Sequence, residues 1–202
     1  MVKTIIFDIG DVLVEVDYHG FLNAISSEFN ISAAELIKKS TNGAHLDYMR
    51  GMLTSEQFVE DVNRKYNQSI SIERFRQLWN LILLRQNNDV ADMVNNLHRQ
   101  YQLVLLSNID PWHFNYCSAN FPVIQTFEKA FLSYEHHLLK PDSQFFKLVV
   151  EQLNVPPAQC LLIDDLADNV KSAEKLGYQI IQFKDAFQLQ NDLKKIGIRL
   201  GE

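Results

Sequence analysis

Five short apolar segments, separated along the second half of the chain by helical periodicity, limit what this sequence can fold into. We expect strands at residues 4–7, 102–106, 130–133, 160–163 and 178–183. Between the later segments, apolar residues recur every three or four positions, as at Val90, Met93, Val94 and Leu97, which predicts amphipathic helices. Strands that alternate with helices predict an α/β fold: a doubly wound, Rossmann-like parallel sheet.

The interval between the first two strands has a different character, with helical periodicity and almost no strand signal. One apolar stripe runs through Phe21, Leu22, Ile25 and Phe29, and residues 54–57 have the sequence of a capping box. We expect a small helical cap over residues 17–85, inserted into a core domain of residues 1–16 and 86–202. Its two connections would lie near residues 15–18 and 84–88, and residues 86–89 at the second are polar and helix-breaking.

Composition narrows the class of protein. The formal charge is −6 and no run of Lys and Arg occurs, which argues against a nucleic acid or an anionic membrane as the main partner. Only two cysteines, Cys117 and Cys160, are present, and they favour a reducing cytoplasm over a disulfide framework. Without a leader or a run of about 18 apolar residues, we expect a soluble monomer or homodimer acting on a small molecule.

Polar groups stand at the ends of the apolar segments. Asp8 follows the first apolar segment, Ser107 and Asn108 end the second, and Asp164 with Asp165 ends the fourth. Lys140 lies between the second and the fourth segments. The carboxyl ends of parallel strands meet at one edge of a sheet, where such folds place their sites. Taken singly, each of these residues is as well explained by a turn, a helix cap or a solvated surface.

Their chemistry suits phosphate. An ionised Asp8 can attack phosphorus and form an aspartyl-phosphate, and Lys140 offers a compact positive charge to the transferring group. Two adjacent carboxylates at Asp164 and Asp165 repel each other unless a cation offsets their charge, and Mg²⁺ prefers such oxygen ligands. Asn169, one turn further on, is placed to orient a ligand or a metal-bound water.

The ordered motifs resemble those of the haloacid dehalogenase superfamily of hydrolases. They are Ile5-Ile6-Phe7-Asp8, Leu106-Ser107-Asn108, Lys140-Pro141 and the segment from Asp164 to Asn169, and together they span nearly the whole chain. The resemblance implies that Asp8 is the nucleophile and that Asp165 binds Mg²⁺ with help from Asp164 or Asn169. It further implies that Ser107, Asn108 and Lys140 bind the phosphoryl group, and that the insertion is a mobile cap.

One departure from the family pattern concerns proton transfer. Most phosphatases of this family carry a second Asp two residues after the nucleophile, whereas this chain has Gly10 there and Asp11 one place later. Gly10 can offer a carbonyl oxygen to the metal but cannot move a proton, so Asp11 is the candidate acid and base. The surrounding sequence resembles a branch that includes bacterial sugar-phosphate phosphatases similar to the glucose-1-phosphate phosphatase, and that branch tolerates glycine here.

The sequence therefore predicts a Mg²⁺-dependent phosphomonoester hydrolase acting on a small sugar phosphate or similar metabolite. Two alternatives stay open: a metal-independent 2-haloacid dehalogenase, and a non-catalytic relative that only binds phosphate. Residues that could select the substrate lie in the cap and in the segment before it; they are Tyr18, His19, Tyr48, Arg50 and Trp79.

Overall fold

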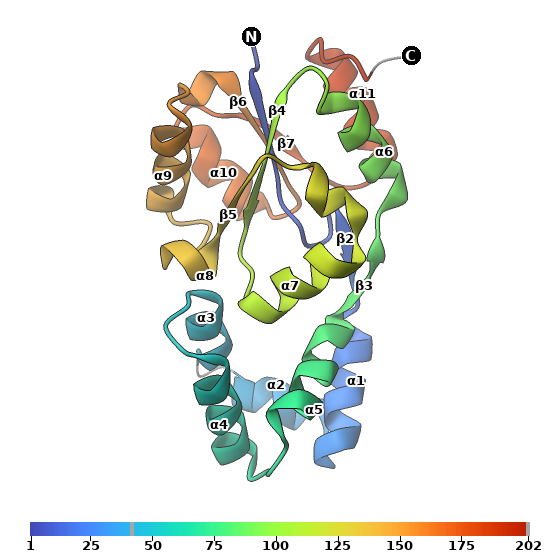
Figure 1. Ribbon diagram of the computed structural model, residues 1–202, viewed down its shortest axis with the longest axis vertical. Helices are drawn as coiled ribbons and strands as arrows, with labels where there is room; N and C mark the ends of the chain where they lie inside the picture. Colours follow the sequence, from blue (N-terminus) through green and yellow to red (C-terminus); the bar gives the residue numbers. More distant parts are fainter. Residues whose placement is uncertain (41–42, 201–202) are drawn as a thin grey trace.

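A five-stranded parallel sheet forms the centre of the molecule, seen here in a computed structural model that describes residues 1–40 and 43–200. Its order is β5-β4-β1-β6-β7 (Figure 1), and every neighbouring pair is parallel. The strands are β1 (Thr4–Phe7), β4 (Gln102–Ser107), β5 (Lys129–Leu132), β6 (Cys160–Asp164) and β7 (Gln179–Gln182). The predicted doubly wound α/β fold is confirmed.

Helices cover both faces of this sheet. They are α6 (Asn88–Leu97), α7 (Pro111–Asn120), α8 (Ser133–His136), α9 (Ser143–Leu153), α10 (Ala167–Lys175) and α11 (Ala186–Lys195). Side chains of β1 alternate between two cores, because Ile5 and Phe7 pack with α6 and α11 while Ile6 packs with α9 and α10. Burial on both faces explains why the three inner strands, β1, β4 and β6, are mostly apolar, whereas the edge strands β5 and β7 include Lys129, Gln179 and Gln182.

Five further helices lie between the first two strands of the sheet in sequence. They are α1 (Tyr18–Phe29), α2 (Ala33–Ser40), α3 (Ala44–Met49), α4 (Ser55–Tyr66) and α5 (Ile72–Trp79). They have a core of their own, rich in aromatic rings such as Tyr48 and Phe58, whose centroids are 4.5 Å apart. Figure 1 shows these helices together beyond one end of the sheet. The division at residues 17 and 85 into cap and core stays a prediction.

Local signals at the helix starts are mostly as predicted. The capping box at Thr54 and Gln57 is present, and Asp110 caps α7 with Pro111 as its first residue. The reading of residues 86–89 as helix-breaking is wrong, because Asn87 accepts a hydrogen bond from the Val90 N–H and caps α6, which begins at Asn88. Polar residues here start a helix instead of interrupting one.

A short antiparallel pair, which the sequence analysis did not predict, joins the two parts. Its strands are β2 (Val14–Val16) and β3 (Leu83–Gln86), and they are the two connections between the sheet and the helical insertion. A 3₁₀ turn, η1 (Asn80–Ile82), leads from α5 into β3. β2 and β3 are short and mix apolar with charged or polar residues, so they show neither a continuous apolar run nor enough positions for a period-two pattern.

The turn after α3 rests directly on the core. The Ser133 hydroxyl donates to the Met49 carbonyl at 2.6 Å, and the His137 Nδ1 lies 2.8 Å from the Arg50 carbonyl oxygen. Gly51 follows with φ of +68°, and a Cβ there would stand 2.1 Å from the carbonyl oxygen of Tyr134. Only glycine allows so close an approach of the two backbones.

Replacing Gly51 by Ala should therefore loosen the contact between cap and core. We expect the free energy of unfolding to fall by about 1–3 kcal/mol, from the strained φ and the displaced backbone together. Gly43→Ala is a matched control, because Gly43 has φ of +77° but nothing within 4 Å of an added Cβ. Equal losses in denaturant unfolding of the two variants would show that the contact with Tyr134 contributes nothing.

A second contact between cap and core is a buried charged pair. Asp110 Oδ2 accepts from Trp79 Nε1 at 2.9 Å and lies 2.8 Å from His113 Nδ1, while His113 Nε2 lies 3.0 Å from the Trp79 carbonyl oxygen. Burial alone would lower the pKa of His113, but the charge and hydrogen bond of Asp110 outweigh burial and raise it above 6.5. The protonated imidazole can donate to both oxygens at once.

This pair predicts a pH dependence of stability. Because the pKa of His113 is raised in the folded state, its stabilisation is present below about pH 6.5 and is lost as the pH rises through the folded-state pKa. We expect the free energy of unfolding to decline over that range, and His113→Gln to remove this part of the decline. The exposed His98 provides a control, since His98→Gln should leave the slope unchanged.

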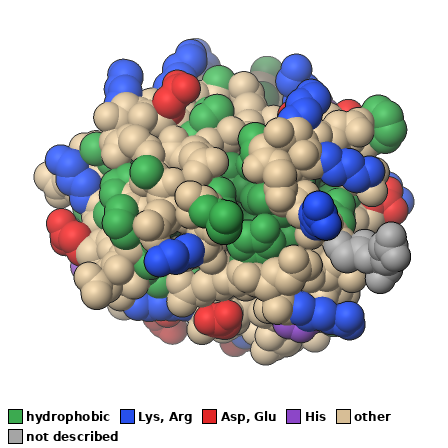
Figure 2. Space-filling model, turned by 90° about the horizontal axis from the view of Figure 1, so that it is seen from above, with side chains coloured by type: hydrophobic (Ala, Val, Ile, Leu, Met, Phe, Trp, Pro, Cys, Tyr) green, Lys and Arg blue, Asp and Glu red, His purple; other side chains and the backbone are tan. Residues whose placement is uncertain are grey.

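The end of the core away from the cap carries both apolar and charged side chains. Seen from the end of the core away from the cap, apolar side chains gather in the middle of the face and Lys and Arg surround them (Figure 2). Within the described residues, no helix has both the length and the apolar character needed to cross a bilayer. Cys117 and Cys160 are both buried, and both are free thiols.

Candidate active site

The carboxyl ends of β1 and β6 bring three carboxylates together. Phe7 pairs with Ile163 in the parallel register, so Asp8 emerges beside Asp164 and Asp165. One oxygen of each carboxylate lies within 4.8 Å of the others. The Asp8 N–H donates to the Ile163 carbonyl at 3.0 Å, and Asp8 Oδ1 accepts from the Ile9 N–H at 2.7 Å. The backbone therefore fixes the direction of the Asp8 side chain.

Lys140 is the counter-ion of this cluster. Its Nζ lies 2.9 Å from Asp8 Oδ2 and 2.6 Å from Asp164 Oδ2, and its side chain is only 1% exposed. Burial would lower the pKa of Lys140, but the two carboxylates outweigh it and raise the pKa above its ordinary value. Lys140 is therefore a fixed positive charge between two acids.

Asp164 has a supporting role. Besides Lys140, it accepts from the Leu166 N–H at 2.9 Å, and Asn169 Nδ2 contacts its two oxygens at 2.9 and 3.1 Å. Asn169 thereby directs its amide nitrogen at Asp164, while its predicted role as a metal ligand stays a prediction. With both oxygens engaged, Asp164 holds Lys140 and the start of α10 in place.

The cluster carries more negative than positive charge. When all three carboxylates are ionised, Lys140 offsets only one of them. Burial raises the pKa of Asp8, and Lys140 offsets this only in part. Burial, together with the charges of Asp8 and Asp164, raises the pKa of Asp165 to about 6. Oxygen donors with a surplus of negative charge are suited to a divalent cation.

Ser107 ends β4 and Asn108 follows it, at the same edge of the parallel sheet as the three carboxylates. Asn108 Nδ2 donates to the Lys140 carbonyl at 2.8 Å, and Asn108 Oδ1 accepts from the Lys140 N–H at the same distance. Asn108 thus fixes the Lys140 backbone, which the sequence analysis did not foresee. Its amide has a second hydrogen, and both Ser107 and Asn108 line a cavity between cap and core.

The structure places Gly10 in the lining of the same cavity and Asp11 on the surface. Asp11 has φ of 53°, and its Oδ1 accepts from the Val16 N–H at 3.1 Å, which stabilises the turn into β2. Its charge is near enough to contribute to the raised pKa of Asp165. Asp11 therefore lies at the rim of the site, close to the acids but outside the buried cluster.

The candidate specificity residues divide into two groups. Tyr18 and Trp79 line the cavity. Tyr48 is buried in the cap with its hydroxyl 2.8 Å from Ser55 Oγ, His19 is exposed, and Arg50 pairs with Asp47 at 3.6 Å. Sequence reasoning missed His113, although its spacing of three from the helix cap Asp110 is typical of an ion pair on one helix face.

Capped α/β hydrolases are the class of protein that this sheet, its carboxylate cluster and the inserted helices define. The family model for a haloacid dehalogenase-like hydrolase matches residues 2–177, so the chain belongs to that family. The resemblance that the sequence motifs indicated is thereby confirmed.

The individual relatives have low sequence identity to this chain. The chain is 25% identical over 210 residues to D-ribitol-5-phosphate phosphatase of Bacteroides thetaiotaomicron, covering 97% of this chain and 98% of the relative. It is similar to the crystal structure of a family enzyme from the same organism in complex with magnesium and inorganic phosphate. That likeness has a TM-score of 0.85 at 27% identity and covers 92% of this chain and 96% of the other.

The L-2-haloacid dehalogenase of Xanthobacter autotrophicus also has this fold. It matches with a TM-score of 0.65 at 18% identity, over 98% of this chain and 85% of the other. At that identity the likeness shows the fold alone.

Proposed function

We propose that this chain is a Mg²⁺-dependent phosphatase that hydrolyses a small phosphomonoester through an aspartyl-phosphate on Asp8. The observation that carries the proposal is Lys140, held by contacts of 2.9 and 2.6 Å between Asp8 and Asp164 beside Asp165. An ionised Asp8, oriented by Lys140 and the Ile9 N–H, attacks phosphorus as the ester P–O bond breaks. Water then attacks the aspartyl-phosphate, releasing inorganic phosphate and restoring the carboxylate.

The residues present fit a Mg²⁺ ion. Asp8, Asp165 and the Gly10 carbonyl would hold it, while Asn169 and Lys140 keep Asp164 in place beside them. When bound, the ion supplies positive charge to the carboxylates and to the transferring phosphoryl oxygens. Ser107, the free Asn108 amide hydrogen and Lys140 would bind that group. Support for the metal comes from the uncompensated charge of the cluster and from the magnesium complex of the related enzyme.

Proton transfer to the leaving group is assigned to Asp11. Its carboxylate lies at the rim of the site, near enough for its charge to act on Asp165. Gly10 has no group that can donate a proton. Substrates whose leaving group departs as a stable anion would depend on Asp11 least.

Two other functions fit less well. A 2-haloacid dehalogenase needs no metal, and the charge surplus at Asp164 and Asp165 would repel its anionic substrate. A phosphate-binding protein without turnover would not need a buried Lys140 to hold a nucleophile in place. The relative that acts on D-ribitol 5-phosphate favours a small phosphorylated metabolite, and the two free cysteines favour the cytoplasm.

The test is release of inorganic phosphate from a panel of phosphomonoesters, with Mg²⁺ and with EDTA. We expect turnover that falls at least about 100-fold on chelation and returns with Mg²⁺. Chloride release from 2-chloropropionate is measured in parallel. Halide release with EDTA present would favour the dehalogenase, and binding of phosphate without turnover of any ester would favour the binding protein.

A further inference from the structure

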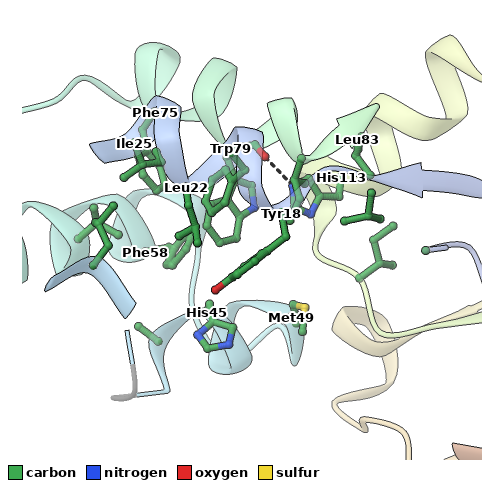
Figure 3. Close-up of a pocket in the computed structure, with 18 of the residues that line it drawn as sticks. Tyr18, Leu22, Ile25, His45, Met49, Phe58, Phe75, Trp79, Leu83 and His113 are labelled. Carbon is green, nitrogen blue, oxygen red and sulfur yellow. Dashed lines mark hydrogen bonds between the residues drawn. The ribbon is translucent and has the colours of Figure 1, made fainter. Parts of the chain in front are cut away.

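The cavity between cap and core has a lining unlike that expected for a sugar phosphate. It has a volume of about 330 Å³ and begins at the phosphoryl site, because Gly10, Ser107 and Asn108 belong to its wall. From there it extends among α1, α3, α4 and α5. Figure 3 shows Leu22, Ile25, Phe58, Phe75 and Trp79 around it. Its size is in the lower part of the range for small-molecule sites.

Three polar rings of the wall, those of Trp79, His113 and Tyr66, have their polar atoms engaged by other residues of the protein. Trp79 Nε1 donates to Asp110, and both ring nitrogens of His113 contact Asp110 or the Trp79 carbonyl, a bond drawn in Figure 3. The two rings stack with centroids 5.3 Å apart and planes 2° from parallel. The Tyr66 hydroxyl donates to the Leu36 carbonyl at 3.2 Å. These side chains therefore present carbon to an occupant.

Charges in the wall balance. Asp61 and Lys65 stand one turn apart on α4 with opposite charge, and Asp61 also pairs with Arg64. Burial lowers the pKa of His45, so its imidazole is neutral at pH 7. Figure 3 shows the Tyr18 hydroxyl directed toward His45, and these two groups add to the polar side chains of Asp61 and Lys65 in the described wall. Asp61 and Lys65 carry one opposite charge each, so the described wall offers a second anionic group no cluster of cations.

We propose that the cavity binds an apolar, aromatic leaving group, so that the substrate is a phosphomonoester of a phenol-like or similarly apolar alcohol. This inference rests on the proposed phosphatase function. A sugar or polyol chain would bring a hydroxyl on nearly every carbon, and each one without a partner would lose its hydration. An aromatic ring matches the wall, and a phenolate-type leaving group depends least on a proton from Asp11.

The experiment compares two series of aryl phosphates that share one reactive group. Para-alkylphenyl phosphates, from methyl to propyl, keep the leaving-group pKa nearly constant while apolar surface grows. We expect kcat/KM to rise about fourfold for each methylene that the cavity holds. The para-hydroxyalkyl counterpart of each ester has similar size and reactivity, and we expect its kcat/KM to be at least about tenfold lower than that of the alkyl ester.

A cavity-filling variant tests where the alkyl group lies. Ala44 lines the cavity from α3, and Ala44→Leu should lower kcat/KM for the propyl ester at least about tenfold while sparing phenyl phosphate. Ala34→Leu is the matched control, because Ala34 is exposed on α2. Thermal unfolding of both variants reports whether the fold is kept. If Ala44→Leu does not fold, the two ester series on the native chain still decide the question.

Binding separates this inference from the phosphatase function. Para-alkylphenyl phosphonates, which cannot be hydrolysed, are titrated while the fluorescence of the two tryptophans, Trp112 and the wall residue Trp79, is followed. We expect the Kd to fall about fourfold per methylene. Turnover of all esters with no response to alkyl length, or with a preference for the hydroxyalkyl series, would overturn the apolar assignment and leave the phosphatase intact. Length-dependent binding without turnover of any ester would overturn the phosphatase and keep the cavity assignment.

Discussion

Asp8→Asn should abolish phosphate release while the fold is kept. An amide cannot attack phosphorus to form the acyl phosphate, so we expect turnover to fall by at least about 10⁴-fold, equivalent to about 5.5 kcal/mol of lost transition-state stabilisation. The pKa of Asp8 is raised by burial, which means that the folded protein disfavours the ionised carboxylate at pH 7. Asn removes that charge at nearly constant volume, so the melting temperature should be equal to or above that of the native chain.

A control variant that loses a different carboxylate distinguishes loss of the nucleophile from loss of one negative charge. Asp168 belongs to the same motif as Asp164 and Asp165, but its side chain is 84% exposed. Asp168→Asn should keep turnover within about twofold, since a solvent-screened charge contributes little. Turnover in Asp8→Asn comparable to that in Asp168→Asn would contradict the aspartyl-phosphate mechanism.

The sheet could be predicted from the sequence because its inner strands, β1, β4 and β6, have apolar side chains on both faces. Side chains at Ile5 and Ile6 enter different cores, so β1 is apolar from Ile5 until Asp8 follows it. The same pattern placed the site, since parallel register alone brings Asp8 beside Asp164. The residues that make up the carboxylate cluster could therefore be predicted from the sequence.

Which side chains of the site form hydrogen bonds with one another could not be predicted in this way. Asn108 and Asn169 both read as ligands, yet their amides hold Lys140 and Asp164, and only the turn geometry after each strand decides that. The wall of the cavity is likewise set by the packing of helices far apart in the chain. Whether Trp79 presents its N–H or its carbon face depends on Asp110, more than thirty residues away.

Lys140→Met should cost both activity and stability. Met has a similar length but no charge, so Asp8 and Asp164 would face each other and Asp165 with no ammonium between them. Removing one partner of a buried ion pair costs about 3–5 kcal/mol, and we expect a loss of that size in the free energy of unfolding at pH 7. Chemical denaturation in EDTA measures it without a contribution from bound metal.

The sign of the pH response separates charge from packing. With Lys140 gone, protonation is the remaining way to relieve the carboxylates, and the pKa of Asp165 is already raised to about 6 in the native chain. The deficit of Lys140→Met should therefore shrink as the pH falls through about 6.

Two further variants complete the argument. Adding Asp164→Asn to Lys140→Met removes an uncompensated charge, so the double variant should be more stable than the single one at pH 7. The exposed Lys171 gives a control, and Lys171→Met should change stability by less than about 0.5 kcal/mol. A pH-independent deficit that the second substitution makes larger would mean that Lys140 stabilises the fold by packing alone, and Lys140 would then lose its assignment as the counter-ion of the nucleophile.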